Sequence, residues 1–192
     1  SKNDIPELIH SLQKKKYTIS KRSLIKVYTK PALKKNKFRF ALNEVSISEK
    51  DHLSMVSINT YVNNTFLNTY WGDGLIISTP TGSTAHSLSC GGPIVMPDSN
   101  NFIITPISSH NLNVRPLIIS DKNTIRIYLD QRFKHFNLSI DGEPIIINKK
   151  HIIFIQKEKF PINFLTTEKN NYFDTLRNKL LWGLDKRNNE ES

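Results

Sequence analysis

Over most of its length the chain alternates hydrophobic and polar residues with a period of two. Successive side chains of a β-strand point to opposite faces, so this alternation predicts half-buried strands. The clearest cases are Phe38, Phe40 and Leu42; Val56, Ile58, Thr60 and Val62; Ile125, Ile127 and Leu129; and Phe136, Leu138 and Ile140. Turn-forming residues separate these segments at Asn63-Asn64, Gly72-Asp73-Gly74, Asp121-Lys122-Asn123 and Asp141-Gly142. We therefore expect residues 18–165 to form an all-β domain, an antiparallel β-sandwich of two packed sheets.

Both ends of the chain change to a helical period. Near the N-terminus the apolar positions that share one helix face are Ile5, Leu8, Ile9 and Leu12. Near the C-terminus they are Phe173, Leu176, Leu180 and Leu184. Asn3 or Asp4 is the expected N-cap of the first helix, and Asn170 or Asn171 that of the second. We thus expect flanking helices within residues 1–17 and 166–185, followed by a disordered tail over residues 186–192.

Charge and cysteine content narrow the choice of partner and compartment. Lys and Arg number 27 against 17 Asp and Glu, a net charge of +10, which favours nucleotides, nucleic acid or anionic membranes. A general abundance of Lys, Asn and Ile, as an AT-rich genome gives, explains the charge equally well. The single cysteine, Cys90, excludes an intrachain disulfide and suggests a cytoplasmic protein. No apolar run is long enough to span a membrane, and no signal peptide opens the chain. Because Ser1 is not preceded by Met, we expect a piece of a longer protein.

A glycine- and hydroxyl-rich segment from Trp71 to Pro93 is the strongest candidate for a binding site. Five of the seven glycines of the chain lie between Gly72 and Gly92, around a short apolar strand over residues 75–77. Glycine allows close approach of a ligand to the backbone, and Ser and Thr add hydrogen-bonding groups without bulk. The segment lacks the lysine of a P-loop. Residues 83–90 could form a short helix whose N-terminus points at an anion. We interpret the segment as a site for a polar ligand.

Other candidate chemistries are less specific. Asn43-Glu44 follows a predicted strand and suits a ribose or base, although a solvated turn is the alternative. Asp73 between two glycines is also compatible with an ordinary turn. The six histidines lack metal-ligand spacing, so we expect no metal site in this chain. Cys90 is interpreted as a buried small residue rather than a nucleophile. The basic residues are spread along the chain without an aromatic-interleaved run, so we expect no nucleic-acid partner.

In combination, these motifs resemble those of the NAD kinase family. The resemblance rests on Asn43-Glu44, on the run from Gly72 through Thr-Pro-Thr-Gly-Ser-Thr-Ala to Pro93, on residues 104–117, on Asp141-Gly142-Glu143 and on residues 173–183. It implies an enzyme that transfers the γ-phosphoryl group of ATP, with a divalent metal (Mg²⁺ is expected), to the 2′-hydroxyl of the adenosine ribose of NAD. It also implies an N-terminal α/β domain, a C-terminal all-β domain, and assembly into homodimers or homotetramers.

The resemblance assigns the NAD-binding residues by motif position. They are Asn43, Glu44, Asp73, Thr84, Ala85, His86, Ser87, Leu88, Ser89 and Glu143. Asn43 and Glu44 would contact the adenosine part of NAD. His86 stands where the family usually has Tyr, and imidazole is a smaller ring that can carry charge near neutral pH.

One departure from the motifs of the NAD kinase family concerns catalytic activity. The chain has no Gly-Gly-Asp-Gly-Thr motif, whose aspartate is the family's expected general base. We therefore predict that no catalytic residue lies in this chain, that its own N-terminal domain is a partner, and that the chain alone is inactive. Two alternatives remain open: a non-catalytic dinucleotide- or nucleic-acid-binding β module, and a lipid kinase of the diacylglycerol type. The lipid kinase would have no reason to carry the dinucleotide motifs.

Overall fold

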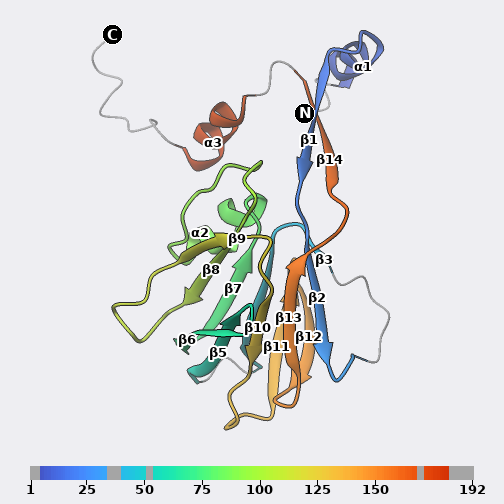
Figure 1. Ribbon diagram of the computed structural model, residues 1–192. Helices are drawn as coiled ribbons and strands as arrows, with labels where there is room; N and C mark the ends of the chain where they lie inside the picture. The colour runs from blue at the N-terminus through green and yellow to red at the C-terminus, as the bar shows by residue number, and fades with distance from the viewer. Residues whose placement is uncertain (1–4, 34–39, 51–53, 168–170, 182–192) are drawn as a thin grey trace, which may run out of the picture. The chain divides into compact units, whose positions relative to one another are not determined.

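A computed structural model describes residues 5–33, 40–50, 54–167 and 171–181 (Figure 1). The chain divides into two compact units. One is the continuous stretch Lys21–Ile162, and the other joins the N-terminal residues up to 20 with the residues from 163 onward. We describe each unit separately.

The first sheet of the continuous unit has six strands in the order β3-β2-β13-β10-β5-β6. Their bounds are β2 (Ile25–Lys30), β3 (Phe40–Ala41), β5 (Val56–Val62), β6 (Thr65–Gly72), β10 (Ile125–Tyr128) and β13 (Ile152–Lys157). Every neighbouring pair is antiparallel.

The second sheet also has six antiparallel strands, in the order β12-β11-β4-β7-β8-β9. Their bounds are β4 (Glu44–Glu49), β7 (Gly74–Ser78), β8 (Asn101–Ile107), β9 (Leu117–Ser120), β11 (His135–Ile140) and β12 (Glu143–Asn148). The prediction of an all-β fold built from two antiparallel sheets is confirmed. Strands such as β4 bury one face and leave the other accessible, as the period of two indicates, whereas β7 and the middle of β8 are buried on both faces.

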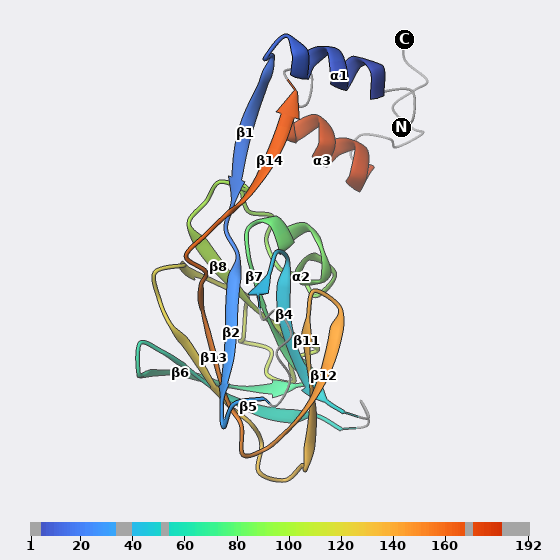
Figure 2. The same ribbon diagram turned by 90° about the vertical axis from the view of Figure 1, so that its right-hand side faces the viewer.

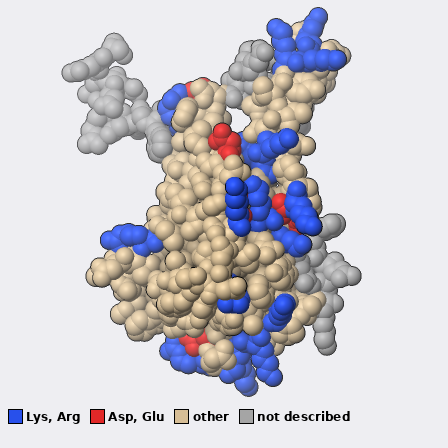
Figure 3. All heavy atoms as spheres, viewed as in Figure 1, with Lys and Arg blue, Asp and Glu red and all other residues tan. Residues whose placement is uncertain are grey.

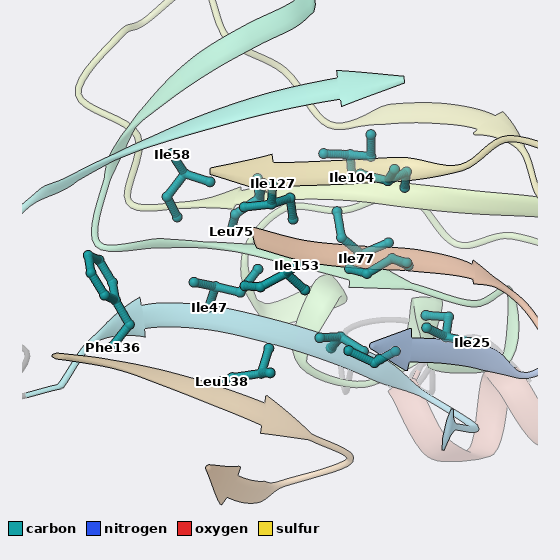
Figure 4. Packing of buried hydrophobic residues seen from close by; sticks show 14 of the residues in the cluster. Ile25, Ile47, Ile58, Leu75, Ile77, Ile104, Ile127, Phe136, Leu138 and Ile153 are labelled. Carbon is teal, nitrogen blue, oxygen red and sulfur yellow. The ribbon is translucent and has the colours of Figure 1, made fainter. Parts of the chain in front are cut away.

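The hydrophobic core lies between the two sheets (Figure 4). The first sheet contributes Ile25, Ile58, Ile127 and Ile153, and the second contributes Ile47, Leu75, Ile77, Ile104, Phe136 and Leu138. All ten side chains are fully buried. Each buried side chain of this size stabilises the fold by about 1.5–3 kcal/mol relative to an exposed one.

The predicted turns occur where expected. Asn63 and Asn64 connect β5 to β6, and Asp141 and Gly142 connect β11 to β12, all four with positive φ. Two consecutive positive φ angles suit two-residue hairpins, and Asn, Asp and Gly tolerate them best. In the short strand β3, however, the buried residue is Ala41, whereas its larger apolar neighbour Phe40 is only half buried.

The other unit contains α1 (Ile5–Gln13), β1 (Tyr17–Arg22), β14 (Ile162–Thr167) and α3 (Tyr172–Leu180). Strands β1 and β14 form a two-stranded sheet (Figure 2). Helix α3 begins as predicted, because the Asn171 side chain accepts a hydrogen bond of 2.9 Å from the Phe173 N–H. The alternative caps Asn3, Asp4 and Asn170, together with Leu184 and the predicted tail, lie outside the described residues. Among the residues described, the helices are too short to cross a membrane.

Candidate functional site

The candidate site lies at the edge of the second sheet where β4 begins and β7 ends. Glu44 pairs with Ser78 in the register of these two strands. Beyond that pair, the Thr79 N–H donates to the Asn43 carbonyl at 2.9 Å, and the Thr79 hydroxyl donates to the Leu42 carbonyl at 2.5 Å. The strand pairing therefore sets Asn43-Glu44 beside the start of the hydroxyl-rich segment.

A glycine then brings that segment directly onto the Asn43 backbone. Gly82 lies in the short 3-10 helix η2 (Thr81–Thr84), and its N–H donates to the Thr79 hydroxyl at 3.1 Å. A Cβ at position 82 would overlap the Asn43 carbonyl. Only a residue without a side chain allows this close approach, which explains why glycine stands here.

The Asp141 carboxylate fixes the loop that carries Asn43 and Glu44. It accepts hydrogen bonds from the backbone N–H groups of Leu42 at 2.6 Å, Asn43 at 2.8 Å and Glu44 at 3.0 Å. In return, the Asp141 N–H donates to the Glu44 carbonyl at 3.0 Å. The β11–β12 turn is thereby attached to the start of β4, and Glu143 comes to the same edge of the sheet.

Glu44 is held in an unfavourable environment for a charged carboxylate. Burial raises the pKa of Glu44 above its ordinary value, and the nearby negative charge of Asp141 raises it further. Its Oε2 atom is buried and has no hydrogen-bond partner in the described part of the chain. Such an unpartnered carboxylate oxygen favours a ligand that donates a hydrogen bond, for example a sugar hydroxyl.

Within residues 83–89, which contain the predicted run from Thr84 to Ser89, the exposure of the side chains separates two groups. Ser83 and Ser87 are fully buried and bond internally: the Ser83 hydroxyl donates to the Pro80 carbonyl at 2.7 Å, and the Ser87 hydroxyl lies 2.8 Å from that of Thr105. The exposed side chains, which can meet a ligand, are those of Thr84, His86 and Ser89; Ala85 and Leu88 are half buried. The side chain of Ser87 is therefore occupied within the fold.

The helix predicted near residues 83–90 is present as two short pieces, η2 and α2 (His86–Ser89), beside the end of β7 (Figures 1 and 2). Each has only four residues. A helix this short offers little dipole, so the idea of an anion at its N-terminus gains no support.

Asp73 lies at the opposite end of β7 from the rest of the site. It precedes Gly74, the first residue of the strand, whereas Thr79 follows its last residue. At about 3.4 Å per residue, the two ends are roughly 20 Å apart. The structure brings together Asn43, Glu44 and the run from Thr84 to Ser89. Asp73 of the same chain lies away from them.

Sequence reasoning missed the structural importance of Asp141 and Thr79. The sequence indicates Asp141 as a turn residue and as part of the Asp141-Gly142-Glu143 motif, but not as the residue that organises the backbone of Asn43 and Glu44. The available signal was the Asp-Gly dipeptide itself, because an aspartate at such a turn can accept several backbone hydrogen bonds. No pattern in the sequence shows that its acceptor groups meet a loop about one hundred residues earlier.

Metal and thiol chemistry find little support at this site. Among the described residues, no three His, Cys, Asp or Glu side chains gather into a metal-binding group. We therefore assign no step to a divalent cation at this site. Burial raises the pKa of the Cys90 thiol, which disfavours the reactive thiolate.

Comparison with known proteins identifies the family. Residues 42–167 match the model of the ATP-NAD kinase C-terminal domain. The chain belongs to the NAD kinase family. The NAD kinase of Flavobacterium psychrophilum is 46% identical over 186 residues, which cover 96% of this chain and 63% of that relative. The NAD kinase of Bacteroides fragilis (strain ATCC 25285) is 39% identical over 187 residues, covering 97% and 64%. The chain thus spans less than two thirds of the length of these NAD kinases.

Solved structures of NAD kinases share the fold. A yeast NADH kinase complexed with NADH matches with a TM-score of 0.84 and 22% identity, over 94% of this chain and 55% of that chain. An NAD kinase from Archaeoglobus fulgidus in complex with ATP matches with a TM-score of 0.75 and 24% identity, over 92% and 66%. At these identities the similarity concerns the fold alone.

Proposed function

We propose that this chain is the NAD-binding part of an NAD kinase, which phosphorylates the 2′-hydroxyl of the adenosine ribose of NAD with ATP as donor. We further propose that the chain is inactive by itself. The observation that carries the proposal is the convergence of Asn43-Glu44 with the hydroxyl-rich segment, around a carboxylate oxygen of Glu44 that has no hydrogen-bond partner among the described residues.

Each group at this edge has chemistry suited to the adenosine end of a dinucleotide. A carboxylate such as that of Glu44 can accept hydrogen bonds from two vicinal ribose hydroxyls, and the Asn43 amide can both donate to and accept from a base. The exposed imidazole of His86 can stack on a ring, and the Thr84 and Ser89 hydroxyls can donate to phosphate oxygens. Ser87 would act by positioning, since its hydroxyl bonds to Thr105.

Phosphoryl transfer needs a group that orients the acceptor hydroxyl and cations that neutralise the transferring phosphate. In this proposal the present chain supplies the acceptor site, and another part of the enzyme supplies the base, the ATP site and the metal. The exposed apolar residues of α1, Ile5 and Ile9 (each 50% exposed) and Leu12 (40%), are consistent with a surface that packs against that other part.

Two measurements test the proposal. Isothermal titration calorimetry should show NAD binding to the 192-residue chain, and Glu44→Gln should weaken that binding about tenfold, the loss of one charged hydrogen bond. Asp98→Asn, which removes an equal charge at an exposed loop position, should leave binding unchanged. An assay of NADP formation with ATP and Mg²⁺ should detect no turnover.

The two parts of the proposal fail separately. Turnover by the chain alone would contradict the missing base while leaving the NAD site intact. Absence of binding heat with NAD, or an equal effect of Asp98→Asn and Glu44→Gln, would contradict the site itself and favour a β module with another ligand.

A further inference from the structure

A row of aromatic and cationic side chains crosses the outer face of the first sheet. Register places its members directly opposite one another on five successive strands, β2, β13, β10, β5 and β6. In that order they are Tyr28, Phe154, Arg126, Tyr61 and Phe66. At about 4.8 Å between strands, the row is roughly 19 Å long. We call these five residues the aromatic row.

The aromatic row is accessible and internally ordered. Phe66 is 54% exposed, and the other four members are half buried. Phe154 and Arg126 are each flanked along their strands by core residues, which turn to the opposite face of the sheet. The rings of Tyr28 and Phe154 stack with centroids 4.8 Å apart, and those of Tyr61 and Phe66 meet edge to face at 5.4 Å. The row is thus a preformed aromatic surface.

Cations are interleaved with these rings. The Arg126 guanidinium lies 5.3 Å from the ring of Tyr61 and 5.4 Å from that of Tyr128, and Lys30 Nζ lies 5.6 Å from the ring of Phe154. Arg126 Nε makes no hydrogen bond within the part of the chain that the structure describes. This Nε atom is buried, so contact with an anionic group is left to the terminal nitrogens of the guanidinium.

A cavity of about 370 Å³ adjoins the aromatic row at Tyr61. Its lining includes Tyr128, Asn59 and Gln131. Asn59 Oδ1 accepts from the Thr69 hydroxyl at 2.6 Å and Gln131 Nε2 donates to the Leu129 carbonyl at 2.9 Å, so Asn59 Nδ2 and Gln131 Oε1 are the groups that can hydrogen-bond the edge of a ring. Asp130 also lines the cavity, but its charge is engaged: the Arg132 guanidinium bonds to it at 2.7 Å and the Ser57 N–H at 2.9 Å. Burial alone would raise the pKa of Asp130, yet these partners together hold it below its usual value.

Charge favours a polyanion over a second copy of this chain. Lys26 and Lys30 alternate with Tyr28 on β2, and Arg126 is the central member of the row, whereas Asp130 is already neutralised by Arg132. Figure 3 shows one face of the molecule, on which Lys and Arg side chains clearly outnumber those of Asp and Glu. Pairing two copies through this surface would bring like charges together, and the net charge of +10 adds to that repulsion.

We propose that the outer face of the first sheet binds a single-stranded polynucleotide, with bases on the aromatic row, one base edge in the adjoining cavity, and phosphates on Arg126, Lys26 and Lys30. On four-stranded sheets of RNA-binding modules, aromatic side chains stack two or three bases in a comparable way. This role is independent of the proposed NAD site, which lies at the edge of the second sheet. In the sequence only the net positive charge pointed to such a partner, because the row runs across five strands and not along one.

Fluorescence anisotropy with a labelled oligouridine about 10 nucleotides long tests the proposal, at about 50 and 200 mM salt. The double variant Tyr61→Leu/Tyr128→Leu should weaken binding at least about tenfold, since each stacked base contributes strongly. Arg126→Gln should lower the slope of log K against log salt by about one. Tyr17→Leu and Lys179→Gln, exposed aromatic and cationic residues of the other unit, serve as matched controls and should change affinity less than twofold.

An abasic oligomer of equal length gives a test that needs no variant. The wild-type chain should bind it at least about tenfold more weakly than oligouridine. Titration with an oligothymidine DNA of the same length shows whether the chain prefers RNA or DNA. Tighter binding of either oligomer than of the abasic one supports the proposal. Equal binding of the abasic oligomer, an equal effect of Lys179→Gln, or no binding at low salt would overturn it. So would sedimentation showing a dimer that the Tyr61→Leu/Tyr128→Leu variant dissociates.

Discussion

Asp141 and Glu44 exchange two backbone-anchored hydrogen bonds of 3.0 Å each, although their carboxylates repel. The Glu44 N–H donates to the Asp141 carboxylate, and the Asp141 N–H donates to the Glu44 carbonyl. The same contact that positions the Glu44 backbone thus raises the pKa of its side chain. This contact therefore affects both the stability of the loop and the hydrogen-bonding chemistry that the Glu44 side chain offers to a ligand.

Replacement of Asp141 should release the loop that carries Asn43. Asp141→Ala removes an acceptor of three backbone hydrogen bonds, and we expect unfolding by urea to show a loss of about 2 kcal/mol. Asp141→Asn keeps one acceptor oxygen and tolerates the positive φ, so about half that loss is expected. NAD affinity should fall with both variants, more with alanine. Equal stability of Asp141→Ala and wild type would show that the loop holds its conformation without this carboxylate.

Glu44→Gln should stabilise the chain at neutral pH while weakening NAD binding. The folded pKa of Glu44 is raised, so wild-type stability falls as pH rises from below the ordinary value of 4.5 through the folded pKa. The variant lacks this loss and should be more stable above that range by up to about 1 kcal/mol, with no difference below it. Thermal unfolding between pH 3.5 and 8 measures the effect. A stability difference that is the same at every pH contradicts the electrostatic explanation.

Gly82→Ala should be much more costly than Gly91→Ala. A Cβ at position 82 overlaps the Asn43 carbonyl, and relief requires a backbone shift that costs about 3 kcal/mol. Gly91 has φ +79° with open space around it, so alanine there meets only conformational strain of about 1 kcal/mol. Denaturant midpoints of the two variants give the comparison. Similar losses would mean that the segment can move away from Asn43 at little cost.

Ser87→Ala should destabilise the fold, whereas Ser89→Ala should not. The buried Ser87 hydroxyl bonds to that of Thr105, and its removal leaves a buried polar group unpaired at a cost of about 1–2 kcal/mol. Ser89 is exposed, and its replacement should change stability by less than about 0.5 kcal/mol. For NAD binding the order should be reversed. Calorimetric titration at a temperature where both variants are folded should show a larger loss of NAD affinity for Ser89→Ala than for Ser87→Ala.

The strands were predictable because half-buried sheets impose a period of two. Ile125 and Ile127, like Phe136 and Leu138, alternate with polar residues and are buried as the pattern indicates. The pattern fails at β3, where Ala41 is buried. A two-residue strand at the edge of a sheet has too few neighbours for its apolar residues to decide which face turns inward.

The candidate site was predictable only as separate pieces. Motifs located Asn43-Glu44 and the run from Thr84 to Ser89, because those segments are continuous in sequence. Their meeting depends on the register of β4 against β7 and on the Asp141 turn, which are long-range properties. For the same reason the sequence did not reveal that Asp73 lies at the far end of β7, or that Arg126 is set between Tyr61 and Tyr128.

The Asp141 contacts also bear on how the protein reaches its native state. They join residues separated by 97 to 99 positions, so the loop at Asn43 cannot be fixed until β11 has docked on β4. Contacts of such long sequence separation form late and slow the folding reaction. Acquisition of ligand affinity during refolding should therefore lag behind the formation of the local hairpin β5–β6, and ligand binding becomes a reporter of completed assembly of the second sheet.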